Sequence, residues 1–170
     1  MTSDPAVDGR TPDSEPASDP AAEPLQDVWL MGYPLRLGVR ASEHYESVFR
    51  EFALLASSEP GPSVPGRMMA LVEEMERRYA RNNAHEQQRD AALARGEEVL
   101  DIRLQVPASA GQIGRRLERM LDETDDFCRD GLLLTLAPAD DVVAFRRWYL
   151  DELVRQLDGV PPTPWPGEAT

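Results

Sequence analysis

The alternation of apolar and polar side chains in one nine-residue segment constrains the fold of this chain most strongly. Between residues 98 and 106 every second position is apolar: Leu100, Ile102, Leu104 and Val106. Successive side chains of a strand point to opposite faces, so this pattern predicts a strand with one buried face. Residues 35–41 show a shorter alternation through Leu35, Leu37 and Val39. We expect this segment to form another strand of the same small sheet.

The two alternating segments are organised alike, and each leads into a helical pattern. Residues 35–42 and 102–109 both end in Ala-Ser. Ser42 and Ser109 suit the N-cap position of a helix, because a serine hydroxyl there can accept a hydrogen bond from the free backbone N–H groups of the first turn. Apolar residues then recur at helical spacing over 42–57 and 109–128. The sequence therefore predicts an α+β fold, in which amphipathic helices cover a small sheet. Two βαα units, in the halves 28–97 and 98–158, are one possible arrangement.

Further helices are expected in each half. Residues 68–79 carry an apolar stripe, residues 84–96 are weakly apolar and end at Gly96, and a last helix follows Pro138. The stripe of the last helix consists of Val142, Phe145, Tyr149, Leu153 and Leu157. Two apolar segments stay open to two interpretations. Leu132–Leu136 is a short buried strand or a packed connection, and Val28–Met31 is an edge strand or an adhesive apolar arm.

The two ends differ in composition from the middle of the 170-residue chain. Residues 1–27 hold seven acidic residues, one arginine and five of the 15 prolines, so they bury too little apolar surface to order themselves. We expect a disordered acidic tail there. Residues 159–170 are rich in proline and predict an extended strap. A single domain over 28–158 lies between them.

Charge and residue usage exclude several functions. The net charge is −13, which disfavours nucleic-acid binding, and all 18 basic residues are arginine, which rules out mechanisms that need a lysine. The chain has neither GxxxxGK[ST] nor GxGxxG, so we expect no nucleotide cofactor. Cys128 is the single cysteine, and no signal sequence or membrane-spanning run is present. These features indicate a cytoplasmic protein that does not enter a membrane.

Two groups of residues are candidate sites. The carboxylates between Asp122 and Asp130 could hold a metal ion, because Asp122 and Asp126 share a helical face. The second group is the predicted contact set for another protein, since arginine and tryptophan are enriched at binding hot spots. It consists of Arg146, Arg147, Trp148, Arg155 and Trp165. Alternatively, Trp148 and Tyr149 pack against the C-terminal strap and Trp165.

The segments Tyr33–His44 and Val142–Leu150, together with the closing Pro161–Trp165, resemble a group of small uncharacterised actinobacterial proteins. The resemblance implies an association with partner-switching components: anti-sigma kinases, STAS-domain antagonists and serine phosphatases. It implies a non-catalytic cytoplasmic regulatory domain that binds another protein. One alternative is a degenerate anti-sigma-kinase-like module, because Asn82-Asn83 and Asp130-Gly131 do not reproduce the ATP site of those kinases. The other is a small metal-dependent enzyme or ligand-binding domain using the Asp122–Asp130 carboxylates.

Overall fold

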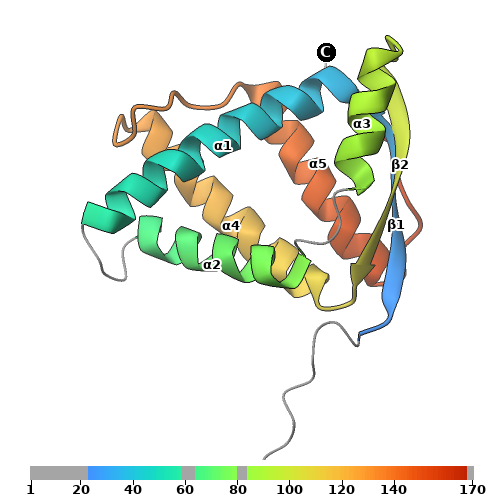
Figure 1. Cartoon of the computed structure of the whole chain (residues 1–170), viewed down its shortest axis with the longest axis horizontal. Helices are drawn as coiled ribbons and strands as arrows, with labels where there is room; N and C mark the ends of the chain where they lie inside the picture. The colour runs from blue at the N-terminus through green and yellow to red at the C-terminus, as the bar shows by residue number, and fades with distance from the viewer. Residues whose placement is uncertain (1–22, 59–63, 80–83, 168–170) are drawn as a thin grey trace, which may run out of the picture.

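Two antiparallel strands and five helices make up the described part of the chain, which covers residues 23–58, 64–79 and 84–167 of a computed structural model (Figure 1). The predicted α+β class is confirmed. The predicted disorder of the acidic tail concerns mainly residues 1–22, which lie outside the described residues. In chain order the elements are β1 (Leu25–Pro34), α1 (Leu35–Ser58), α2 (Val64–Tyr79), α3 (Ala84–Ala94), β2 (Val99–Pro107), α4 (Ala110–Arg129) and α5 (Asp140–Leu157).

The strand predicted from the longer alternation is confirmed as β2. It pairs antiparallel with β1, so that Val28 lies opposite Leu104 and Leu30 opposite Ile102, and these four side chains are buried on one face. The segment Val28–Met31 is thus part of a strand, which begins at Leu25, three residues before the expected start of the domain. The register shifts between Leu30 and Tyr33, where Gly32 has a φ of +65° that suits a bulge.

The predicted strand at residues 35–41 is wrong, because α1 begins at Leu35 and the predicted cap Ser42 lies inside the helix. The alternation of Leu35, Leu37 and Val39 spans only five residues. The buried residues of this segment continue instead at helical spacing through Ala41 and Tyr45 to Val48 and Phe52. Of the two similar segments only 102–109 contains a strand, which ends at Pro107, and three helices separate β1 from β2 in the described part of the chain. Both halves nevertheless begin with a strand that is followed by helices, three in the first half and two in the second, and the strand of the first half is β1.

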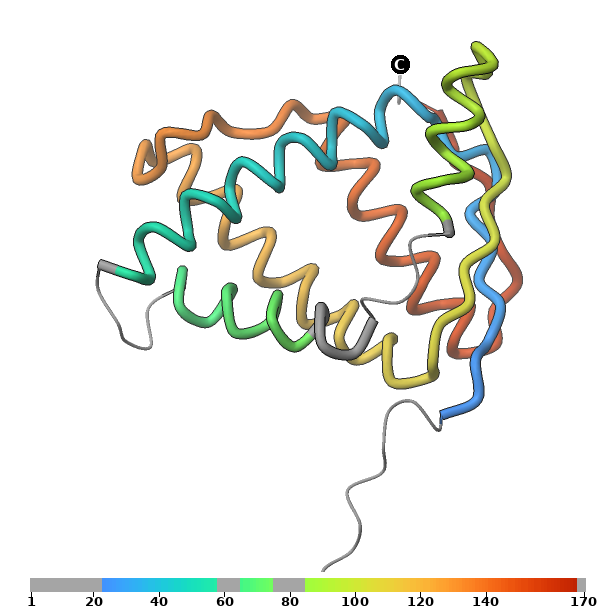
Figure 2. Tube along the Cα trace, viewed as in Figure 1, coloured from blue at the N-terminus to red at the C-terminus, as the bar shows by residue number. Residues whose placement is uncertain are grey.

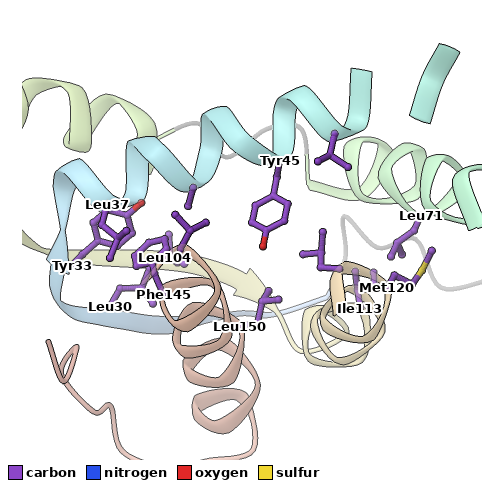
Figure 3. Close-up of a cluster of buried hydrophobic side chains, with 14 of the residues drawn as sticks. Leu30, Tyr33, Leu37, Tyr45, Leu71, Leu104, Ile113, Met120, Phe145 and Leu150 are labelled. Carbon is purple, nitrogen blue, oxygen red and sulfur yellow. The ribbon is translucent and has the colours of Figure 1, made fainter. Parts of the chain in front are cut away.

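The helices enclose a common core beside the strand pair. Figures 1 and 2 show β1 and β2 as a ribbon along one side of the molecule, with α3 next to it, while α1, α2, α4 and α5 surround the interior. Buried side chains from the strands and from all five helices form one cluster, part of which is drawn in Figure 3. None of the described helices combines the length and apolarity needed to cross a membrane.

The end of α4 is set by Gly131, as the sequence predicts. Its φ of +68° lets the N–H of Gly131 donate to the Cys128 carbonyl and the N–H of Leu132 donate to the Phe127 carbonyl. These two bonds satisfy carbonyls that the last helical turn leaves free, in a Schellman motif. At the other end, Ser109 occupies the predicted cap position, but its side chain makes no capping hydrogen bond. Residues 132–136 form a connection and not a strand.

Candidate functional site

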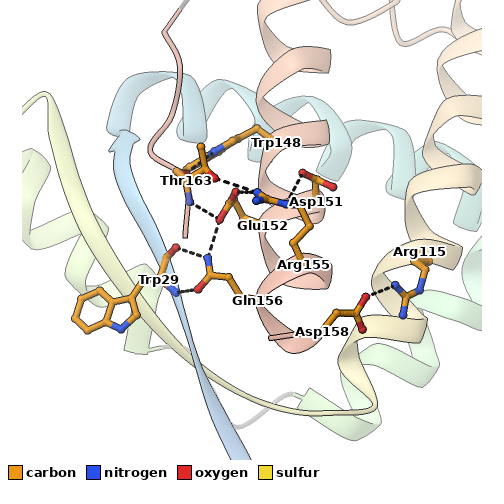
Figure 4. A network of polar contacts seen from close by, with 9 residues as sticks. All are labelled: Trp29, Arg115, Trp148, Asp151, Glu152, Arg155, Gln156, Asp158 and Thr163. Carbon is orange, nitrogen blue, oxygen red and sulfur yellow. Dashed lines mark hydrogen bonds and ion pairs between the residues drawn. The ribbon is translucent and has the colours of Figure 1, made fainter. Parts of the chain in front are cut away.

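The C-terminal strap is bound to the molecule by a network around Glu152, a residue with no exposed surface (Figure 4). Its carboxylate accepts hydrogen bonds from the Arg155 guanidinium at 2.5 Å, the Gln156 amide at 2.8 Å and the Thr163 backbone N–H at 3.0 Å. Arg155 also donates to the Thr163 hydroxyl at 3.1 Å. The predicted contact residue Arg155 is therefore engaged within the chain, where it fixes the strap.

The same helix blocks the free edge of β1. The Gln156 amide donates to the Trp29 carbonyl at 2.7 Å and its oxygen accepts from the Trp29 N–H at 2.8 Å, as a neighbouring strand would. Further along this edge, the Trp165 N–H donates to the Met31 carbonyl at 2.9 Å. Unpaired edge groups invite association with other chains, so these bonds protect the sheet.

The two predicted contact tryptophans pack on each other. The rings of Trp148 and Trp165 meet edge to face with centroids 5.3 Å apart, and Phe145 packs against both. The Trp148 indole N–H donates to the Thr163 carbonyl at 3.2 Å. For Trp148 the structure thus bears out the alternative prediction of packing against the strap.

The neighbouring arginines of α5 occupy different environments. Arg146 is buried, and its guanidinium lies 2.5 Å from the Asp122 carboxylate and 3.3 Å from that of Asp125. Arg147 is more than half exposed and reaches the same Asp122 oxygen at 3.1 Å. Both arginines lower the pKa of Asp122 against the opposing effect of its partial burial, whereas burial raises the pKa of Asp125. Arg146 therefore supports the α4–α5 contact and is not part of an exposed surface.

The Asp122–Asp130 carboxylates do not converge on a metal site. Asp122 and Asp125 face Arg146, Asp126 pairs with Arg129, and no group of three potential metal ligands occurs among the described residues. Cys128, in the same helix, is buried, and burial together with nearby carboxylates raises the pKa of its thiol. This environment disfavours a nucleophilic thiolate.

Two adjoining cavities, each partly open to solvent, lie between the helices and the strand pair. One, of about 420 Å³, is bordered by β1, α1, α3, α4 and α5, and the other, of about 230 Å³, by β2, α3, α4 and α5. Figure 3 shows the Tyr45 ring reaching from α1 into this region, towards the helix that carries Leu150. The residues that line both cavities are His85, Leu117, Tyr149 and Leu150. The sequence reasoning missed this site, because its residues come from six separate elements.

The connection between α4 and α5 carries a second feature that the sequence reasoning missed. Leu132, Leu134 and Leu136 expose 61%, 93% and 83% of their surface, and only Leu133 points into the core. We call Leu132–Leu136 the leucine segment. The run of leucines led us to predict a buried strand or a packed connection. Gly131 and Pro138, which flank the run, are residue types typical of loops and were the signal that could have indicated an exposed connection.

The leucine segment is held in place by Glu51 of α1. The Glu51 carboxylate accepts from the backbone N–H groups of Leu134 at 2.6 Å and Thr135 at 3.0 Å, and from the Thr135 hydroxyl at 3.0 Å. Partial burial raises the pKa of Glu51, but these three hydrogen bonds outweigh it and lower the pKa below 4.5. An ionised acceptor thus fixes the segment while its leucines face solvent.

Comparison with known proteins gives one partial likeness. A nicotinamide-nucleotide adenylyltransferase from Aeropyrum pernix is 37% identical to this chain over 79 residues, a match that covers 41% of this chain. It covers 44% of that protein, so the chain spans less than half the length of this relative. No family model matches the chain, and no solved structure matches it.

Proposed function

We propose that this chain is a non-catalytic protein-interaction domain of a cytoplasmic regulatory system, of the partner-switching kind that its sequence resembles, and that the leucine segment is its contact surface. The observation that carries the proposal is the exposure of three leucines in a segment that Glu51 holds in a fixed conformation. A fixed segment loses little conformational entropy on binding, so apolar contacts made there contribute fully to affinity.

The surroundings of the leucine segment define the kind of partner. Leu54 and Leu55 of α1 are exposed by 69% and 41%, and they lie within one helical turn of Glu51. Around the segment, Asp130 and Asp140 are exposed and acidic, and Asp126 is exposed but paired with Arg129. A partner that covers this surface therefore presents an apolar patch with basic side chains at its rim, because charge complementarity steers association.

The predicted contact set has a different role in this proposal. Trp148 and Arg155 bind the strap, which carries Trp165, and Arg146 joins α5 to α4. These residues stabilise the fold that presents the leucine segment. Arg147 keeps an exposed side chain, but its guanidinium is already paired with Asp122.

Site-specific crosslinking tests the proposal. A photoreactive amino acid at position 134, in the organism that makes the protein, should capture one specific partner. The same amino acid at Val99, which is 58% exposed, serves as the matched control. Val99 is the first residue of β2, and Figure 1 shows β2 on the side of the molecule opposite the connection between α4 and α5. We expect capture at position 134 and none of the same protein at position 99. Equal capture at both positions would count against the leucine segment.

The partial match to a nicotinamide-nucleotide adenylyltransferase suggests a second candidate function, adenylyl transfer to a nicotinamide nucleotide. We give it lower priority, because the chain contains no lysine and no common glycine-rich phosphate loop. Incubation of the purified chain with a nicotinamide mononucleotide and an adenylyl donor should yield no dinucleotide. Enzyme-dependent formation of the dinucleotide would overturn our choice.

A further inference from the structure

The two adjoining cavities, each partly open to solvent, differ in chemistry. The smaller one is lined by aliphatic side chains of β2, α4 and α5 apart from His85 and Tyr149; among them are Val106, Ile113 and Leu153. The larger one contains most of the polar side chains: Tyr33, Glu86, Arg89 and Arg146 line it together with Tyr45. A ligand that extends through both cavities would therefore have one polar end and one apolar end.

The polar end of the site is well supplied with hydrogen-bond donors. Tyr149 lines both cavities, and its hydroxyl makes no hydrogen bond within the described part of the chain. Arg89 lies beside the Tyr33 hydroxyl, and its side chain is only 19% exposed; its Nε also donates to the Asp90 carboxylate at 3.1 Å. Burial raises the pKa of both tyrosines, so their hydroxyls stay protonated and available as donors at neutral pH.

One close approach in the fold preserves this polar end. The Tyr33 hydroxyl lies over Gly38 of α1, so closely that a Cβ at position 38 would be 2.1 Å from the hydroxyl oxygen. A larger residue at position 38 would displace the Tyr33 ring from its place beside Arg89. Gly38 therefore determines where one of the donors of the larger cavity lies.

We infer that the paired cavities bind a small amphiphile, a medium-chain carboxylic acid, with its carboxylate near Arg89, Tyr33 and Tyr149 and its hydrocarbon chain in the smaller cavity. The guanidinium favours a planar anionic acceptor, and protonated tyrosines can donate to it. The hydrocarbon chain would replace empty space among aliphatic side chains, which is favourable because it removes apolar surface from water. The larger cavity, of about 420 Å³, lies within the range of small-molecule sites, and the smaller one, of about 230 Å³, lies below it.

Calorimetric titration of the full chain with three ten-carbon probes tests the inference. Sodium decanoate, decanol and decylammonium share one hydrocarbon chain and differ in the charge of the polar group. We expect decanoate to bind about tenfold more tightly than either of the others, because hydrogen bonds to a charged acceptor are the stronger ones. Equal affinity for all three, or no decanoate binding, would overturn the inference.

Three variants locate the bound probe. Tyr149→Phe removes only a hydroxyl, and Arg89→Gln removes a positive charge; each should weaken decanoate binding about tenfold. Arg95→Gln, just beyond the same helix and outside the cavity lining, is the matched control and should bind as the wild type does. Val106→Phe fills the smaller cavity and should abolish binding. Unchanged affinity in both Tyr149→Phe and Arg89→Gln would contradict the site, even if Val106→Phe fails to fold.

A thermal measurement provides an independent readout. Decanoate should raise the midpoint of thermal unfolding of the wild type, because a ligand that binds only the folded state stabilises it. It should raise the midpoint less in Tyr149→Phe. An equal rise in both proteins would show that decanoate acts elsewhere. Crosslinking at position 134 is a separate test, so failure of the cavity leaves the leucine segment standing.

Discussion

The backbone N–H of Thr163 donates a 3.0 Å hydrogen bond to the carboxylate of Glu152, a side chain with no exposed surface. This bond attaches the proline-rich strap to α5. Because Arg155 and Gln156 donate to the same carboxylate, one acidic residue organises the whole network.

Replacing Glu152 by alanine should destabilise the protein substantially. The change leaves the Arg155 charge and the Thr163 N–H without their acceptor, and loss of one partner from a buried ion pair costs about 3 kcal/mol or more. Urea unfolding of Glu152→Ala measures this cost. Asp151→Ala is the control: its carboxylate is 59% exposed and lies 3.8 Å from Arg155, so we expect a loss below about 1 kcal/mol. Similar losses in the two variants would contradict the role of Glu152.

The adjacent arginines of α5 offer a second comparison. Arg146→Ala should lower the free energy of unfolding by about 3 kcal/mol, because it leaves the buried Asp125 without its guanidinium partner. Arg147→Ala removes a guanidinium that is 55% exposed and should cost less than about 1 kcal/mol. Denaturant unfolding of both variants checks the difference. The reverse order would mean that Arg146 does not support the α4–α5 contact.

Two helical glycines should respond to alanine with opposite signs. A Cβ at Gly38 would lie 2.1 Å from the Tyr33 hydroxyl and 2.5 Å from the ring, so Gly38→Ala should destabilise by about 1–3 kcal/mol. A Cβ at Gly111 would meet Leu157 at 3.6 Å, an ordinary contact, and alanine favours a helix. Gly111→Ala should therefore stabilise by up to about 1 kcal/mol. Thermal unfolding of the two variants tests both signs.

The conformation of the leucine segment should depend on pH through Glu51. The folded protein lowers the pKa of this carboxyl below its ordinary value of 4.5, so its ionised form stabilises the contact above that pH. The contribution is lost as the pH falls through the lowered pKa. Hydrogen exchange, corrected for the intrinsic rate, should show the Leu134 and Thr135 amides protected at pH 7 and unprotected in acid.

A matched pair of variants tests the assignment to Glu51. Glu51→Ala should abolish the protection of these two amides at pH 7. Glu46→Ala, an exposed acidic position of the same helix, should leave it unchanged. Protection that persists in Glu51→Ala would show that other contacts fix the leucine segment.

The elements with long patterns were predictable from the sequence. The strand β2 and the helix α4 each follow a pattern over many residues, and both were predicted within two residues of their observed ends. Leu35–Val39 was too short for alternation to be distinguished from helical spacing. The segment is helical, because buried residues at helical spacing continue beyond Val39: Ala41, Tyr45, Val48 and Phe52.

The candidate sites depended on contacts that a single sequence does not reveal. Trp148 and Trp165 are 17 positions apart, and their packing follows from the return of the strap along α5. The exposure of Leu134 depends on Glu51, a residue 83 positions away in the chain. Residue types indicated which side chains could form contacts, but the partner of each was set by tertiary structure.

The most direct test of the central claim is the affinity for the partner that crosslinking identifies. Leu134→Ser should weaken binding of the purified partner about tenfold or more, since loss of a buried apolar contact at an interface centre costs at least about 1.4 kcal/mol. The control, Val99→Ser, should bind as the wild type does. An affinity for Leu134→Ser equal to that of Val99→Ser would contradict the claim that the leucine segment is the contact surface.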